Sequence, residues 1–296
     1  MSGPASPPAA RRRLRLKDVT LCAADSLYPA LAARALELCV ARADFADAIL
    51  FSDAAVTGNF RRVPIAPLKS LEDYSRFCLR DMPGLTTTPF VLVVQWDGYV
   101  VDTDAWSNTF RTCDYIGAPI YSGDGNVVVG NGGFSLRSRR LLDALPALPP
   151  ALGLPEDWVI CRSSRPVLEQ KYGVRYAPLA LASRFAYEVK HPGKDTFVFH
   201  GPPNFWRHES DAEVLRIYAS LPPRALIGFS FFGLMIGSLQ HGRAALAEGL
   251  YGLSRAAWGA DKIRAEMLRS IPPDLVEQTL AALEEGHRQA GASPES

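Results

Sequence analysis

Three polar residues stand just behind short apolar runs, and their types suit metal or ligand binding. Asp53, Asp97 and His200 each come within three residues of the end of such a run. In open α/β sheets, ligands bind outside the carboxyl ends of the strands. An Asp and a His meeting there would offer a hard oxygen and an imidazole nitrogen to Mn²⁺ or Mg²⁺. The plain alternatives are a turn role for Asp97 beside Gly98 and a hydrogen-bonded loop role for His200.

Two further segments have an unusual composition. Residues 130–135 (GNGGFS) are too rich in glycine for an ordinary strand edge, so this segment either lets the backbone approach a ligand or forms a tight hairpin turn. It lacks both the Gly-Lys-Ser/Thr of a phosphate loop and the GxGxxG spacing. Glu156 and Asp157 open a helical pattern, where carboxylates favour the helix dipole. Alternatively, one of them is a general base held near a substrate hydroxyl.

Two charged motifs are interpreted as structural. Asp102 and Asp104 form an Asp-x-Asp just before Ala105-Trp106, where Asp is a natural helix cap. Arg137, Arg139 and Arg140 could face phosphate. Because they surround the start of a helix capped by Ser138, we expect a solvated basic face instead.

Strands alternating with helical patterns must position these residues, which indicates an α/β sheet with parallel strands. A helix should start at a cap on Asp25 or Ser26, another should span 70–82 with Ser70 as its cap, and a third should start after Ser138. A further helix opens at Glu156. Everything after about residue 210 reads as helical. The expected strands are 19–23, 48–51, 90–94, 115–116, 127–129, 132–136, 174–177 and 197–199.

The amino-acid composition excludes several classes of protein. The 296 residues are 48% hydrophobic, which excludes disorder, and 32 Lys+Arg against 31 Asp+Glu give no field that would mark nucleic acid as a partner. The five cysteines are scattered, so we expect reduced thiols in a cytoplasmic protein rather than disulfides or zinc. We expect disordered tails over 1–15 and 286–296, an α/β domain over 16–208 and a helical region over 209–285.

The uncharged stretch 225–240 (ALIGFSFFGLMIGSLQ) is shorter than the roughly 20 residues that span a bilayer. We therefore expect a buried helix. A face that touches the membrane surface, with the protein peripheral at the inner membrane, is the second interpretation.

The order of the motifs resembles one family. QWDGYVVD, CDYIGAPI, VGNGGFSLRSRRLL, PEDWVICR and FVFHG follow one another as in uncharacterised bacterial domains described as glycosyltransferase-like. The resemblance covers roughly residues 16–207, and the QWDG and GNGGFSLRS stretches are its most specific parts. It implies a GT-A-like fold, that is, a nucleotide-sugar-binding, Rossmann-like, mixed and mostly parallel sheet flanked by helices, with a helical C-terminal appendage.

The resemblance also implies roles for individual residues. Asp97 takes the position of a metal-binding carboxylate and His200 that of a late metal ligand, for Mn²⁺ or Mg²⁺. Asp157 or Glu156 corresponds to the base. Gln95 stands where Asp-x-Asp enzymes have their first Asp, so the site has one charge fewer. The nucleotide-sugar would contact Asp53, Asp97 and Gln95, and the acceptor side would include Asn131, Gly132, Gly133 and Phe134.

The function that follows is transfer of a sugar from a nucleotide-diphosphate sugar to a glycan or other hydroxyl acceptor, inverting and metal-assisted, in polysaccharide or surface-glycan assembly. Three alternatives stay open. The first is a catalytically degenerate module that binds a nucleotide-sugar or glycan, which the Gln95 substitution suggests. The second is a membrane-surface scaffold acting through 225–240. The third is a nucleotidyltransferase.

Overall fold

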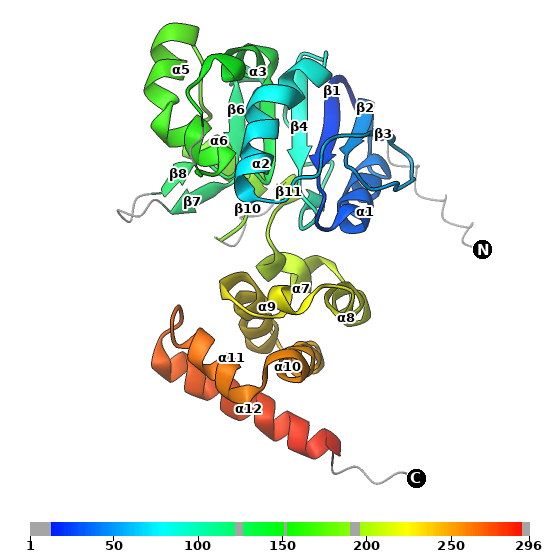
Figure 1. Ribbon diagram of the computed structural model, residues 1–296, viewed down its shortest axis with the longest axis vertical. Coiled ribbons are helices and arrows are strands. Elements are labelled where there is room, and N and C mark those ends of the chain that lie inside the picture. Colours follow the sequence, from blue (N-terminus) through cyan, green and yellow to red (C-terminus); the bar gives the residue numbers. More distant parts are fainter. Residues whose placement is uncertain (1–12, 122–126, 151–152, 190–195, 292–296) are drawn as a thin grey trace, which may run out of the picture.

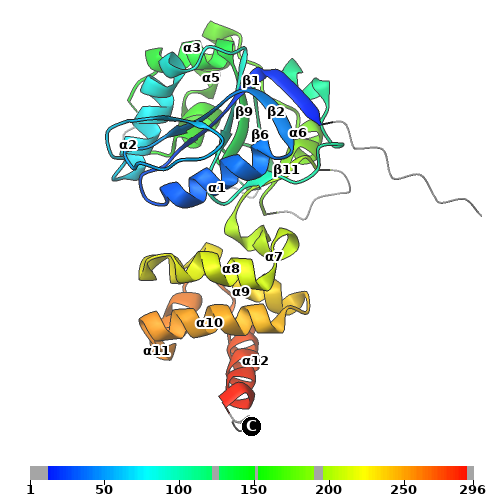
Figure 2. The same cartoon turned by 90° about the vertical axis from the view of Figure 1, so that its right-hand side faces the viewer.

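The computed structural model describes residues 13–121, 127–150, 153–189 and 196–291. The chain forms two parts, which lie one above the other in Figure 1. An α/β part holds all the strands, and the helices from α8 onward form a separate stack below it, with α7 between the two (Figures 1 and 2). The helical C-terminal region therefore meets the α/β part near α7.

The central sheet is mixed and mostly parallel. Its strand order is β3-β2-β1-β4-β9-β6, in which β3, β2, β1 and β4 run parallel while β9 pairs antiparallel with both β4 and β6. Its mixed, mostly parallel character is as expected, whereas β3 was not among the expected strands. The strands are β1 (Leu14–Ala24), β2 (Ala43–Phe51), β3 (Arg61–Val63), β4 (Phe90–Val94), β6 (Tyr115–Gly117) and β9 (Phe134–Ser138).

A second, small sheet positions the candidate site. It has the order β10-β11-β5, formed by Ala186–Tyr187, Val198–Phe199 and Tyr99–Val100. β11 and β5 are antiparallel, with Val198 opposite Val100 and Phe199 opposite Tyr99. In this register, the residue that follows β11 lies beside the residues that precede β5. A separate hairpin-like pair joins β7 (Pro119–Tyr121) and β8 (Val127–Val129).

Local signals explain where several helices begin. The Ser70 hydroxyl accepts from the Asp73 amide at the start of α2, and the Ser138 hydroxyl accepts from the Leu141 amide at the start of α3. Asp25 accepts from the Leu27 and Tyr28 amides just ahead of α1. The helices are α1 (Pro29–Val40), α2 (Leu71–Arg76), α3 (Arg139–Ala144), α4 (Glu156–Trp158), α5 (Arg165–Tyr172), α6 (Leu179–Phe185), α7 (Phe205–His208), α8 (Asp211–Ala219), α9 (Phe229–Gln240), α10 (Ala244–Trp258), α11 (Ala260–Met267) and α12 (Pro273–Gly291).

The apolar segment 225–240 begins in a 3₁₀ turn and forms α9 from Phe229 onward, and most of the large side chains of α9 pack inside the helical stack. Phe231, Phe232, Leu234 and Met235 are buried, as the buried-helix interpretation predicts, whereas Phe229 is 66% exposed. Within the described residues, no helix combines the length and the apolar character needed to cross a bilayer.

Several boundaries differ from the sequence predictions. β1 begins at Leu14, inside the span 1–15 expected to be a tail, and α12 continues to Gly291, inside the span 286–296 expected to be disordered. Residues 1–12 and 292–296 lie outside the described residues. The strand expected over 174–177 is wrong, because Tyr176 makes only an isolated bridge to Tyr115.

The helix expected over 70–82 is also interrupted. α2 ends at Arg76 and continues as a π-helical turn over Phe77–Asp81 and a 3₁₀ turn over Met82–Leu85. Pro83 lies in that last turn, and a proline cannot continue the α-helical hydrogen-bond ladder.

Candidate active site

Asp97 and His200 meet at the edge of the sheet. Asp97 lies between β4 and β5, and His200 directly follows β11, so the β5–β11 pairing brings them together. His200 Nε2 lies 3.2 Å from Asp97 Oδ1, and the Gly201 amide donates to the Asp97 carbonyl at 3.0 Å. Both side chains are buried. Two residues 103 positions apart in the sequence therefore form one ion-pair contact.

His200 is surrounded by acceptors. Its Nε2 lies 3.2 Å from Gln95 Oε1, and its Nδ1 lies 3.5 Å from Glu188 Oε1. Burial by itself lowers the pKa of an imidazole, but the carboxylates of Asp97 and Glu188 outweigh it and hold the pKa of His200 well above its usual value. The pocket around this ring therefore favours positive charge.

The residues around Asp97 fit a cation that is shared with a ligand. Asp97 Oδ1 is buried and faces His200 Nε2 at 3.2 Å. Within the described residues, no group of three or more His, Cys, Asp and Glu side chains is arranged to hold a metal ion. A carboxylate, an imidazole and the Gln95 amide oxygen nevertheless suit Mg²⁺ or Mn²⁺, since such ions keep waters and take further oxygens from substrate phosphates.

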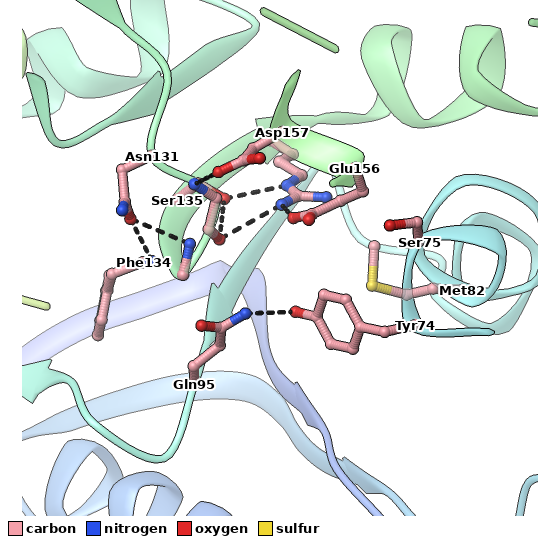
Figure 3. Close-up of polar contacts among 12 residues, drawn as sticks. Tyr74, Ser75, Met82, Gln95, Asn131, Phe134, Ser135, Glu156 and Asp157 are labelled. Carbon is pink, nitrogen blue, oxygen red and sulfur yellow. Dashed lines mark hydrogen bonds and ion pairs between the residues drawn. The ribbon is translucent and has the colours of Figure 1, made fainter. Parts of the chain in front are cut away.

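The glycines of the GNGGFS segment allow the backbone to pass against these side chains. A Cβ on Gly133 would lie 2.0 Å from His200 Nε2, and a Cβ on Gly132 would lie 2.4 Å from Glu156 Oε1. Asn131 Oδ1 accepts from the Gly133 amide at 3.0 Å and from the Phe134 amide at 3.4 Å (Figure 3). The glycines therefore permit a close approach to the protein's own side chains, those of His200 and Glu156, and their approach to a ligand stays a prediction.

This contact makes Gly133 a sensitive test position. Gly133→Ala should displace the His200 ring and lower stability by about 1–3 kcal/mol, which is usual for inserting a methyl group into a packed site. Thermal melting checks the stability. Gly130→Ala is the matched control, since its Cβ would meet the Ile120 side chain at 3.1 Å and the Cys161 Cβ at 3.6 Å and should cause a smaller loss. Equal melting temperatures for the two variants would contradict the proposed clash.

Glu156 and Asp157 are neighbours with different surroundings. Glu156 Oε1 pairs with Arg137 Nη2 at 2.7 Å, and both side chains are buried. Asp157 is half-buried. One carboxylate oxygen accepts from the Gly132 amide at 2.9 Å (Figure 3), and the other accepts from the Trp158 amide at 2.7 Å. Burial raises the pKa of Asp157 to about 6, and the Glu156 carboxylate adds to the rise. Glu156 is thus a counter-ion, and Asp157 is the carboxylate free to titrate.

Arg137 corrects a sequence prediction. We expected a solvated basic face, but Arg137 is fully buried on β9, where its Nε donates to Ser135 Oγ at 3.0 Å and Nη2 reaches the Gly132 carbonyl at 3.4 Å. Arg139 is half-buried and donates to backbone carbonyls of the segment before β4, among them that of Pro83 at 2.9 Å. Side chains alternate between the two faces of a strand, and Arg137 points inward. The prediction had placed Arg137 beside the start of a helix, so it did not consider this strand position.

Two side chains of this cluster were not anticipated. Tyr74 accepts from Gln95 Nε2 at 3.0 Å, and Glu188 Oε2 accepts from Asn131 Nδ2 at 2.8 Å. Tyr74 reads as one aromatic residue on a helix. Glu188 follows β10, a two-residue strand with no clear pattern in the sequence. Neither position carried a sequence signal of its own.

Asp53 lies near Asp25, whose pKa is raised by burial and further by the charges of both Asp53 and Asp97. Asp53 follows β2, is exposed, and within the described residues no hydrogen bond joins it to Asp97 or His200. A cavity of about 310 Å³ lies at the same edge of the sheet, beside Gln95. It is lined by Ala24, Asp25, Ser26, Leu27, Tyr28, Leu68, Ser70, Leu71, Tyr74, Gln95 and Trp96.

The Asp-x-Asp formed by Asp102 and Asp104 lies in a turn. Asp102 Oδ1 accepts from the Asp104 amide at 2.9 Å, ahead of the 3₁₀ helix over Asn108–Thr112 that Ser107 caps. The five cysteines are free and buried, as expected for reduced thiols.

Residues 57–200 match DUF5672, a family of proteins of unknown function. That segment contains Gln95, Asp97, the glycine segment, Asp157 and His200. No curated protein matches the chain.

The fold is similar to solved structures at low identity. A crystal structure of an active-site mutant of LgtC is 16% identical, covering 64% of this chain and 90% of that one, with a TM-score of 0.40. The mannosyltransferase PcManGT from Pyrobaculum calidifontis, in complex with GDP-Man and Mn²⁺, is 13% identical, covering 96% and 89%, with a TM-score of 0.41. A glycosyltransferase involved in glycosylation of the major capsid of PBCV-1 is 12% identical, covering 62% and 91%, with a TM-score of 0.38.

Proposed function

We propose that the protein transfers a sugar from a nucleotide-diphosphate sugar to a hydroxyl acceptor, with inversion at the anomeric carbon. The observation that carries the proposal is the convergence of Asp97, His200 and Gln95 beside the glycine segment that also holds Asp157. A buried carboxylate beside an imidazole and an amide oxygen suits a cation on the phosphate side of such a donor. A second carboxylate with a raised pKa suits proton abstraction.

In the proposed reaction, Asp157 removes the proton of the acceptor hydroxyl as the acceptor oxygen bonds to the anomeric carbon. The bond from that carbon to the phosphate oxygen breaks, and the nucleoside diphosphate leaves with the electron pair. A divalent ion, when held by Asp97 and His200 with Gln95, supplies positive charge near the leaving diphosphate. Asn131 and Glu188 hold the glycine segment against His200, so they fix the distance between the two ends of the site.

One observation favours a second candidate, a module that binds a nucleotide-sugar without turnover. The Gln95 amide is already engaged on both sides, by the Tyr74 hydroxyl and by His200. A neutral side chain also gives the site less charge for holding a cation than a carboxylate would.

Calorimetry with GDP and with UDP, each with and without MnCl₂, tests the proposal. We expect one nucleoside diphosphate to bind with an affinity that Mn²⁺ increases. Release of nucleoside diphosphate from GDP-mannose and a panel of UDP-sugars without acceptor then separates the two candidates, since an active site transfers some sugar to water. Binding with no release favours the module, and no binding in any condition contradicts both.

A further inference from the structure

The two ends of the Gln95 amide contact different groups. Its Nε2 donates to the Tyr74 hydroxyl at 3.0 Å, and its Oε1 lies 3.2 Å from His200 Nε2. Figure 3 shows the amide oxygen pointing away from Tyr74. A half-turn about the last bond of the side chain would exchange the oxygen and the NH₂ group. The end that faces His200 therefore decides whether Gln95 can offer an oxygen to a cation.

The backbone of Gln95 is held on both sides. Its amide donates to the Gly133 carbonyl at 2.9 Å, and its carbonyl accepts from the Gly98 amide at 3.3 Å. Gln95 also directly follows β4, which is paired with β1 on one side and with β9 on the other. The fold therefore fixes where the side chain starts, and the contacts of the amide must set which way it turns.

Tyr74 reaches this amide from α2. Its side chain is half-buried and borders the 310 Å³ cavity together with Gln95. A phenol is neutral at pH 7, and its oxygen can accept an N–H while it keeps its own proton. Because Tyr74 accepts from Nε2, it holds the NH₂ end of the amide on the side away from His200.

The groups on the other side of the amide attract positive charge. The Asp97 carboxylate lies 3.2 Å from His200 Nε2, and the Glu188 carboxylate lies 3.5 Å from His200 Nδ1. A cation beside them takes an amide oxygen as a ligand, whereas an NH₂ group would turn its positive end toward the cation. Gln95 can therefore help to hold a cation only in the orientation in which Nε2 donates to Tyr74.

We propose that Tyr74 is a positioning residue, which turns the Gln95 amide so that its oxygen faces the cation held by Asp97 and His200. This inference rests on the proposed function and names the residue that makes Gln95 an oxygen ligand. A carboxylate offers an oxygen at either end, whereas an amide needs a partner that selects its oxygen. Tyr74 and Gln95 thus act together where one carboxylate would act alone.

Tyr74→Phe tests this inference, since it removes the hydroxyl and keeps the ring that lines the cavity. The amide then loses its acceptor and can turn over. We expect the affinity for GDP or UDP with MnCl₂ to fall about tenfold, whereas without MnCl₂ it should stay within about twofold. Calorimetry measures both affinities, and thermal melting shows that the variant is folded. Tyr28→Phe, which removes another hydroxyl from the same lining, is the matched control and should keep the Mn²⁺ effect.

A double-mutant cycle separates orientation from packing. Gln95→Glu replaces the amide with a carboxylate of the same shape, which presents an oxygen to the cation whichever way it turns. In this background, Tyr74→Phe should change the affinity measured with MnCl₂ by no more than about twofold. A packing role of Tyr74 would instead give the same loss in both backgrounds.

The outcomes separate this inference from the proposed function. If the original protein binds a nucleoside diphosphate with a Mn²⁺ effect that Tyr74→Phe keeps, or that it loses equally in both backgrounds or equally in Tyr28→Phe, the assignment of Tyr74 is wrong and the proposed function stands. Binding that Mn²⁺ does not increase overturns this inference and leaves a nucleotide-sugar as the donor. No binding in any condition overturns both.

Discussion

Asp97→Asn should abolish the Mn²⁺-dependent part of nucleoside diphosphate binding. The substitution keeps the shape of the side chain and removes the buried charge that faces His200 at 3.2 Å. A bound cation contributes several kcal/mol to holding a diphosphate, so we expect an affinity loss of about 100-fold or more in the presence of Mn²⁺. Calorimetry with and without MnCl₂ measures it.

Asp102→Asn is the matched control for this experiment. Asp102 belongs to the one literal Asp-x-Asp near the site, and its Oδ1 accepts the Asp104 amide, a role that an Asn oxygen can keep. We expect this variant to bind as the original protein does. Retention of the full Mn²⁺ effect in Asp97→Asn would overturn the assignment of Asp97, and its loss in Asp102→Asn would move the metal site to the turn.

Asp157→Asn should remove transfer while leaving donor binding within about twofold. General-base assistance is worth about 10²–10⁴-fold, so turnover should fall by that factor. Asp157 accepts hydrogen bonds from the Gly132 and Trp158 amides through its two oxygens, whereas an Asn side chain has only one oxygen to accept them. We therefore expect a stability loss of only about 1 kcal/mol. Single-turnover transfer, measured beside calorimetry of the donor, separates the two effects.

The pH dependence of transfer by the original protein should also show the titration of Asp157. The active form of the base is the carboxylate, and the pKa of Asp157 is raised to about 6. Transfer should therefore be half-maximal near pH 6, close to full about one unit above it, and should fall about tenfold per unit well below it. Asp157→Asn should lose this acidic limb. A limb at the same pH in that variant would assign it to another group.

Glu156→Gln gives the contrast to Asp157→Asn. It leaves the buried Arg137 guanidinium without its counter-ion, and breaking such a pair costs about 3–5 kcal/mol. We expect a clear fall in melting temperature, with transfer retained by the protein that stays folded. Transfer lost in Glu156→Gln at a temperature where it is folded would give Glu156 the catalytic role instead.

Residues that close a strongly patterned strand could be predicted from the sequence. Phe90–Val94 is an unbroken apolar run, so its end was clear, and Asp97 lies there. His200 follows Phe197–Phe199 in the same way. Asp97 and His200 meet because β5 pairs with β11. Each of these strands has two residues, so no local sequence pattern predicts the pairing.

Buried polar residues could not be predicted in this way. Arg137 looks like one member of a basic cluster, and only the fold shows Glu156 and the Gly132 carbonyl around it. Glu188 is one acidic residue among many until β10 brings it to His200. Charge-pairing inside a fold depends on contacts distant in sequence, whereas apolar periodicity is local.

The short β5–β11 ladder has a consequence for how tightly this site can bind. Backbone hydrogen bonds set Tyr99 opposite Phe199, and the Gly201 amide donates to the Asp97 carbonyl, so Asp97 and His200 are held side by side before anything binds. Little conformational entropy is then lost on association, because no loop has to be ordered to assemble the pair. Crystals grown with and without a nucleotide should superpose closely at Asp97 and His200.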